Sequence, residues 1–169
     1  MTDPERPRIV SSQHLAEGGM ADVSEYEYGL MIAYNGFTRW VQRCMAAAGQ
    51  PELSVLEGLV LHHTNHRERE KRLSDICFLL NIEDLHTVNY ALKKLLKQGL
   101  VISTKRGKEV FYRTSDEGRE VCLRYAEVRR LCLLRSLPEG SGNEFEEVAA
   151  FLRRVSGHYD QASRAAASL

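Results

Sequence analysis

Residues 73–113 read LSDICFLLNIEDLHTVNYALKKLLKQGLVISTKRGKEVFYR, and this stretch decides the fold. Its first eight residues place apolar side chains at three- and four-residue steps, the spacing of one buried helical stripe, at Leu73, Ile76, Cys77 and Leu80. Ser74 suits the N-cap of this helix, and Asn81 suits its end. The pattern therefore predicts a short helix followed by a tight turn.

A second helix is predicted directly after that turn. Asp84 suits its N-cap, and Gly99 suits the left-handed residue that follows a helix. Four apolar residues recur at helical spacing and form the expected core face: Leu85, Val88, Leu92 and Leu95. The opposite face is polar and cationic, with His86, Thr87, Asn89, Tyr90, Lys93, Lys94 and Lys97. Two helices joined in this way form a helix-turn-helix.

A β-hairpin is predicted after the second helix. Residues 100–104 and 110–114 are rich in β-branched and aromatic side chains, which strands favour. The segment between them, KRGKE at 105–109, contains Gly107, which can adopt the positive φ of a tight hairpin turn. Helix, turn, helix and hairpin in this order predict a winged helix-turn-helix, with a basic turn at the tip of the wing.

This arrangement of side chains suits double-stranded DNA. A polar helix fits the major groove, where Asn89 can pair with adenine and Thr87 can contact a thymine methyl group or a phosphate. Lysines suit phosphates, and the cations of the wing can reach the backbone or the neighbouring minor groove. The residues expected at DNA are Ser74, His86, Thr87, Asn89, Tyr90, Lys93, Lys94, Lys105, Arg106 and Lys108.

Two segments carry a family resemblance. TVNYALKKLLKQGLV at 87–101, followed by RTSDEG at 113–118, resembles the multiple-antibiotic-resistance regulator (MarR) family. The resemblance spans roughly residues 23–160 when the flanking helices are counted. It implies a homodimeric regulator that binds a pseudo-palindromic operator, often as a repressor. It also implies a small aromatic or anionic effector, bound between the DNA-binding lobe and the dimer interface.

The remainder of the chain is predicted to support and pair this winged helix, which spans about residues 54–114. Residues 1–22 contain Pro, Gly and polar residues and suggest a flexible arm. Residues 23–49 and 115–165 have the apolar periodicity of long helices, and the resemblance makes them dimerisation helices. We therefore expect a mainly α fold with a small β-wing, as a single domain over residues 23–165. Tyr34, Phe37 and Trp40 on the first helix are the candidate effector contacts.

The charge distribution agrees with a central nucleic-acid site. The 169 residues have a net charge of zero, but residues 62–114 hold 11 Lys and Arg against 6 Asp and Glu. A positive middle between acidic ends is expected if only the middle contacts phosphates. The chain has no run of 18 apolar residues and no apolar N-terminal signal, so we expect a cytoplasmic protein without a membrane partner.

Other kinds of site are weakly supported by the sequence. His62 and His66 are four residues apart, as metal ligands on one helix face can be, but no nearby ligand completes a set. Four cysteines without dense spacing fit a reducing compartment. We find no phosphate-binding loop, nucleophile–base pair or paired carboxylates, and we expect no enzyme, no cofactor and no metal.

One alternative function stays open. The turn before the second helix carries Glu83 and Asp84, which would repel a phosphate that they faced, and capping accounts for Asp84 but not for Glu83. The short wing also lacks the Asp-x-Arg signature usual in the MarR family. These departures suit a winged-helix protein-interaction module that does not bind DNA.

Overall fold

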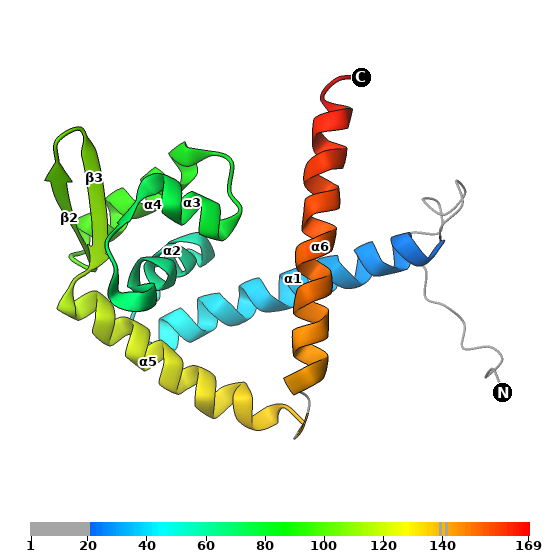
Figure 1. Cartoon of the computed structure of the whole chain (residues 1–169). Coiled ribbons are helices and arrows are strands. Elements are labelled where there is room, and N and C mark those ends of the chain that lie inside the picture. Colours follow the sequence, from blue (N-terminus) through cyan, green and yellow to red (C-terminus); the bar gives the residue numbers. More distant parts are fainter. Residues whose placement is uncertain (1–20, 139, 141) are drawn as a thin grey trace. The chain divides into compact units, whose positions relative to one another are not determined.

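The predicted helix-turn-helix is present in the computed structural model as α3 (Leu73–Leu80) and α4 (Leu85–Lys97) (Figure 1). The structure describes residues 21–138, 140 and 142–169. The predicted arm at 1–22 lies almost wholly outside these residues, and α1 (Ala21–Ala47) begins at the first of them.

The ends of α3 and α4 follow from local chemistry. Asn81 takes the left-handed conformation, with φ of +53°, and this ends α3. The Asp84 carboxylate accepts hydrogen bonds from the backbone N–H of His86 (2.9 Å) and from the hydroxyl of Thr87 (2.6 Å), which confirms it as the N-cap of α4. The prediction for Ser74 is wrong: the N-cap of α3 is Arg72, two residues earlier, and its backbone N–H donates to the Asp75 carboxylate at 2.9 Å.

The core forms where α1, α2 (Val55–Asn65), α3 and α4 pack together. Its largest fully buried side chains come from all four helices and include Val41, Met45, Leu61, Ile76, Val88, Leu92 and Leu95. Leu85, predicted to be on this face, is instead 48% exposed. It is the first residue of α4, and the core side of that helix begins one turn later, at Val88.

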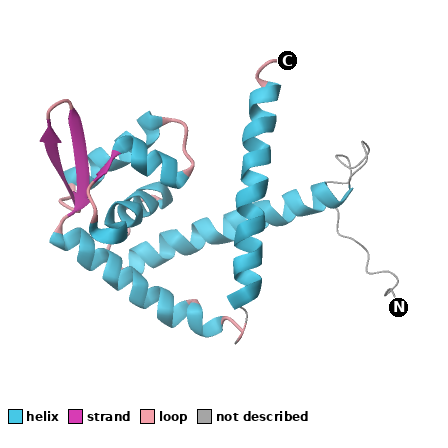
Figure 2. Ribbon diagram, viewed as in Figure 1, coloured by secondary structure: helices cyan, strands magenta, loops and turns pink. Residues whose placement is uncertain are grey.

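The wing is a three-stranded antiparallel sheet in the order β1-β3-β2, drawn in magenta in Figure 2. β2 (Val101–Arg106) pairs with β3 (Glu109–Thr114), so that only two residues, Gly107 and Lys108, form the turn. Gly107 has a φ of +62°, as the hairpin prediction required. The short β1 (Lys71–Arg72) pairs with β3 and joins the wing to the start of α3.

A buried lysine shapes the segment that leads from α2 into β1. The Lys71 ammonium group donates to the carbonyl oxygens of Thr64 (3.2 Å), His66 (2.5 Å) and Arg69 (3.1 Å). The first of these carbonyls lies in the last turn of α2 and the other two follow the helix end, where carbonyls lack helical donors. Lys71 therefore holds the chain in the path that lets β1 pair with β3.

The chain divides into two compact units, residues 1–128 and residues 129–169. The first contains the winged helix and most of α5 (Asp116–Cys132), and the second contains η3 (Leu134–Ser136) and α6 (Gly142–Ala166). Within the predicted helical region 115–165, α5 ends at Cys132 and a 3₁₀ turn follows before α6. None of the described helices combines the length and apolar composition that crossing a bilayer requires.

Candidate nucleic-acid interface

The exposed side of α4 forms a polar ridge. His86, Tyr90, Lys93 and Lys97 follow one another at spacings of four, three and four residues, and all four are exposed. Such spacing places them on one face of a helix. Tyr90 is 73% exposed, and the Lys93 ammonium group lies 5.7 Å from the centroid of its ring. The ridge therefore offers an aromatic ring, an imidazole and two cations to a partner.

Three predicted contact residues lie at the edges of this ridge. Asn89 is half-buried, so its side-chain amide is less accessible to a partner than the four exposed residues of the ridge. Thr87 is exposed, but its hydroxyl donates to the carboxylate of Asp84. Hydrogen bonds from Thr87 and the backbone of His86 hold the pKa of Asp84 below its usual value, so this carboxylate stays ionised. Lys94 is half-buried and forms an ion pair with Glu57, 2.8 Å away.

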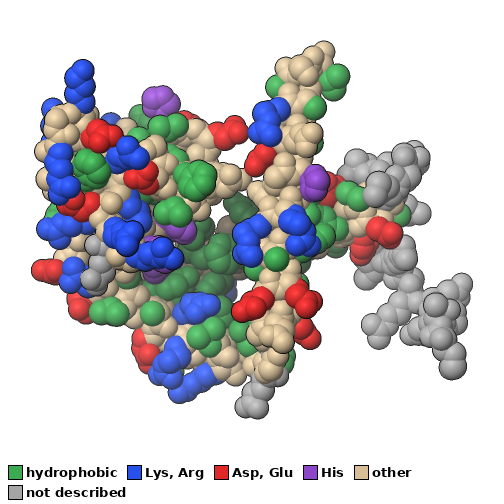
Figure 3. Space-filling view, in the orientation of Figure 1, with side chains coloured by type: hydrophobic (Ala, Val, Ile, Leu, Met, Phe, Trp, Pro, Cys, Tyr) green, Lys and Arg blue, Asp and Glu red, His purple; other side chains and the backbone are tan. Residues whose placement is uncertain are grey.

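The wing supplies the other cations. Lys105 and Lys108 are exposed, and neither forms an ion pair with any residue that the structure describes. Figure 3 shows Lys and Arg side chains over the part of the molecule that carries β2 and β3, with Asp and Glu side chains among them. Ser74, at the first turn of α3, is exposed as well. The candidate interface therefore combines α3, the ridge of α4 and the tip of the wing.

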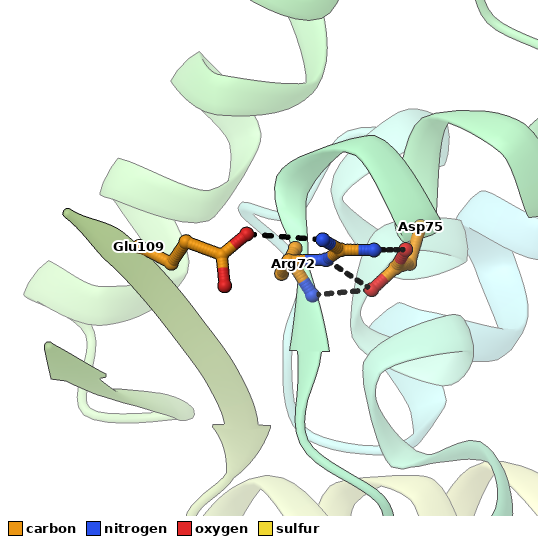
Figure 4. Close-up of polar contacts among 3 residues, drawn as sticks. All are labelled: Arg72, Asp75 and Glu109. Carbon is orange, nitrogen blue, oxygen red and sulfur yellow. Dashed lines mark hydrogen bonds and ion pairs between the residues drawn. The ribbon is translucent and has the colours of Figure 1, made fainter. Parts of the chain in front are cut away.

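Arg72 joins the wing to α3 through a cluster of carboxylates (Figure 4). Its guanidinium group donates to the Asp75 carboxylate at 3.2 and 3.3 Å, and to the Glu109 carboxylate at 3.0 Å. The hydrogen bonds from Arg72 hold the pKa of Asp75 below its usual value. Because these groups come from β1, α3 and β3, they restrain the wing against the helix-turn-helix.

A further ion pair joins β2 to the segment that leads into β1. Arg106 on β2 lies 2.5 Å from the carboxylate of Glu70, and its guanidinium carbon lies 5.2 Å from the centroid of the Phe111 ring. The Arg106 side chain is nevertheless 59% exposed. Exposed ion pairs of this kind contribute at most about 1 kcal/mol, so a phosphate can compete for the guanidinium group.

Sequence reasoning missed several residues that shape this interface. Arg72, Glu70 and Glu109 had no recognisable signal, because their partners lie far away in the sequence. Glu57 had one: Ser54 and Glu57 have the Ser-x-x-Glu spacing of a capping box. That box is present, with Ser54 N donating to Glu57 Oε2 at 2.7 Å and Glu57 N donating to Ser54 Oγ at 3.3 Å.

The candidate effector residues on α1 differ in exposure. Tyr34 and Phe37 are 64% and 48% exposed, whereas Trp40 packs partly against the core. No three His, Cys, Asp or Glu side chains gather as a metal site needs in the part of the chain that the structure describes. None of the four cysteines, all of which lie in the described residues, forms a disulfide bond, and Cys132 is the exposed one.

His62 is the one histidine with a strongly displaced pKa among those described. Its ring lies edge-on to that of Tyr125, with centroids 4.2 Å apart, and its Nε2 is buried without a hydrogen bond. Burial, followed by the nearby charge of His63, lowers the pKa of His62 to about 4.

This pKa predicts acid sensitivity of the folded chain. Below the ordinary pKa of histidine, His62 is protonated in the unfolded chain but stays neutral in the folded chain. The free energy of unfolding therefore falls as the pH drops towards 4. The full displacement corresponds to about 3 kcal/mol. His62→Phe should remove most of this loss between about pH 7 and pH 4.5 in urea unfolding. The exposed His86→Gln should retain the loss, and equal curves for the two variants would contradict the assignment.

The comparisons with known proteins agree with this geometry. Residues 53–118 match a family model described as a winged helix DNA-binding domain. The fold is similar to that of AbfR of Staphylococcus epidermidis, at 16% identity and a TM-score of 0.69, covering 86% of this chain and 99% of that one. It is also similar to the transcriptional regulator BldR from Sulfolobus solfataricus, at 20% identity and a TM-score of 0.65, covering 80% and 98%.

A third solved structure carries the family name. A MarR transcriptional regulator from Methanosarcina mazei Go1 is 13% identical with a TM-score of 0.65, covering 79% of this chain and 97% of that one. No curated protein sequence matches the chain. The winged-helix fold class and the resemblance read from residues 87–118 are confirmed at the level of the fold.

Proposed function

We propose that this chain, which carries a winged helix DNA-binding domain in the fold of the MarR transcriptional regulators, is a sequence-specific regulator that binds double-stranded DNA as a homodimer. The observation that carries the proposal is the exposed ridge of α4, together with a wing whose tip carries Lys105 and Lys108, two exposed cations without an ion pair in the described residues. A helix with a polar, cationic outer face fits the major groove, and a basic hairpin reaches the adjoining backbone.

The roles of the side chains follow from their exposure and chemistry. His86 and Tyr90 form the N-terminal half of the ridge and would meet base edges, with Asn89 reaching adenine from one side of it. Phosphates would be met by groups that are exposed and donate hydrogen bonds: Ser74, Lys93, Lys97, Lys105 and Lys108. Thr87 would act through its methyl group, because its hydroxyl is bound to Asp84.

Dimer formation is supported by apolar surface on the terminal helices. On α1, Met31, Ile32 and Phe37 are about half exposed, and on α6 the same holds for Phe145 and Val148. Exposed apolar stripes of this kind mark association surfaces. A two-fold dimer would present two ridges about 34 Å apart, one turn of the duplex. An effector that binds Tyr34 and Phe37 would then act through this surface and change the spacing of the ridges.

The proposed division between base and phosphate contacts predicts different losses for different variants. Asn89→Ala should weaken the preferred duplex by about 10- to 100-fold, the cost of one bidentate base contact, and should hardly change binding to random DNA. Arg106→Ala and Lys108→Ala should weaken both, because phosphates carry no sequence information. Fluorescence anisotropy with the two duplexes measures each loss, and equal losses for all three variants would remove Asn89 from base reading.

The experiment that tests the function itself is selection of duplexes from a random library with the wild-type protein, followed by footprinting on the enriched sequence. A palindromic sequence with half-sites one helical turn apart is the expected result. Light scattering on the free protein and its complex measures the stoichiometry. Failure to enrich any sequence would overturn the proposal.

A protein-interaction module without DNA binding remains the second candidate. One observation favours it: Lys94, Arg72 and Arg106, all near the candidate interface, are each paired with a carboxylate. Such pairing reduces the cationic character of the surface.

A further inference from the structure

We infer that Lys94 is a positioning residue rather than a phosphate contact, and that with Glu57 it sets the orientation of α4 for reading DNA. This inference rests on the proposed function, because it assigns a role within the same interface. We call Ser54, Glu57 and Lys94 the α2–α4 latch.

The latch is built from short contacts between two helices. The Lys94 ammonium group donates to Glu57 Oε2 at 2.8 Å and to the backbone carbonyl of Glu52 at 2.9 Å. Glu57 Oε2 also accepts the backbone N–H of Ser54 at 2.7 Å. One carboxylate therefore closes the capping box of α2 and holds α4 at the same time.

The carboxylate is suited to this double task. The Glu57 side chain is only 14% exposed. Burial opposes its ionisation, but the hydrogen bonds from Lys94 and Ser54 outweigh that effect and keep the pKa of Glu57 below its ordinary value. If Lys94 moved to a phosphate, the largely buried Glu57 carboxylate would lose its cation and face the anion of the DNA. That exchange is unfavourable, because a partly buried charge needs its partner.

Lys94 lies on the side of α4 that faces the start of α2, where its bonds to Glu57 and Glu52 can restrain rotation of α4 about its own axis. The core side chains Val88, Leu92 and Leu95 hold the opposite part of the helix against the domain. Thr87 and Tyr90 precede Lys94 by seven and four residues, so they share its side of α4. These three residues, with Ser54 and Glu57, line a groove of about 440 Å³ between α2 and α4.

The consequence is a link between the start of α2 and the side chains that would read bases. A small rotation of α4 about its axis moves the tips of Tyr90 and Asn89 relative to the groove floor of the duplex. Loss of the latch should therefore reduce sequence discrimination. It should leave the number of neutralised phosphates unchanged, since no phosphate contact is removed.

The test uses the full-length protein with three single variants and one double variant. Lys94→Met and Glu57→Gln each remove one charge of the latch, and the double variant removes both. Lys93→Met is the matched control, because Lys93 is the neighbouring, exposed lysine without an ion pair in the described residues. Affinity is measured over a range of salt concentrations for the duplex enriched by the wild-type protein and for a random-sequence duplex.

A positioning role gives a defined result. Lys94→Met and Glu57→Gln should each lose about tenfold in affinity for the enriched duplex, a change worth about 1.4 kcal/mol, with an unchanged salt slope. The double variant should lose no more than either single one, because the two residues act as a unit. Lys93→Met should weaken both duplexes and reduce the log–log salt slope by about one unit per chain.

Two results would overturn the inference. In the first, Lys94→Met reduces the salt slope as Lys93→Met does. In the second, Glu57→Gln strengthens binding, as removal of an anion beside a direct phosphate contact would. If the wild-type protein binds no duplex at all, the proposed function fails, but the latch is still decided by thermal unfolding. There the losses of the two single variants must be non-additive in the double variant, and additive losses would reject the latch.

Discussion

Gly118→Ala is expected to destabilise the winged helix by about 4 kcal/mol or more, which is large for a single methyl group. A Cβ atom at Gly118 would lie 1.9 Å from the backbone oxygen of Leu100. That oxygen already accepts the backbone N–H of Ser115 at 3.1 Å, and Leu100 itself is 1% exposed. Because the obstacle is buried backbone, it cannot move aside as a flexible side chain would.

The surrounding contacts explain why α5 approaches so closely. The Ser115 hydroxyl donates to the carbonyl oxygen of Gly99 at 2.6 Å and accepts the N–H of Gly118 at 3.0 Å. The first turn of α5 is thereby fastened to the end of α4 and the start of β2. An alanine at 118 would push α5 away from this junction, breaking these hydrogen bonds.

Thermal unfolding followed by circular dichroism measures the effect. A loss of this size should lower the melting temperature by roughly 10 °C or more for a chain of this length. Gly29→Ala is the control, since a Cβ at Gly29 in α1 meets no atom within 4 Å. It should stabilise the helix by up to about 1 kcal/mol. If the Gly118→Ala protein has the melting temperature of the wild type, α5 does not pack closely against the Leu100 backbone in solution.

The affinity for DNA is expected to fall by about 10⁴-fold when salt is raised from about 50 to 200 mM. Lys93, Lys97, Lys105 and Lys108 are exposed, and none forms an ion pair within the described parts of the chain. A dimer would carry eight such groups, which gives a log–log slope of roughly −7 at about 0.9 per phosphate.

A double variant makes this prediction specific to the wing. Lys105→Gln with Lys108→Gln removes two phosphate contacts per chain and should reduce the slope to roughly −4. Arg43→Gln, an exposed change on α1, should leave it unchanged. Weak, salt-insensitive binding by the wild-type protein would instead favour the protein-interaction module.

Much of the winged helix could be predicted because its signals are local. Asp84, Asn81, Gly99 and Gly107 each mark a helix end or a turn through the conformation or hydrogen bonds of their own backbone neighbours. Such preferences act over a few residues and are therefore visible in one sequence. Leu85 shows the limit: periodicity placed it on the core face, but the core does not extend to the first residue of α4.

The candidate site was predicted less completely than the fold. Residue type and spacing indicated the outer face of α4 and the basic wing, and His86, Tyr90, Lys93 and Lys108 are exposed as a contact surface requires. The same pattern could not separate Lys94 from Lys93. Lys94 is bound to a carboxylate 37 residues away, whereas Lys93 forms no ion pair in the described residues.

By itself, the sequence determined the order of helix, turn, helix and wing, because caps, turns and periodicity depend on nearby residues. The tertiary structure alone decided which Lys and Arg side chains are paired with carboxylates, and where two segments of backbone come into contact. Arg72 with Glu109, Lys94 with Glu57, and Gly118 with Leu100 are each brought together by packing across long chain separations. Their energies depend on distances of a few ångström, and only the folded arrangement of helices and strands sets such distances.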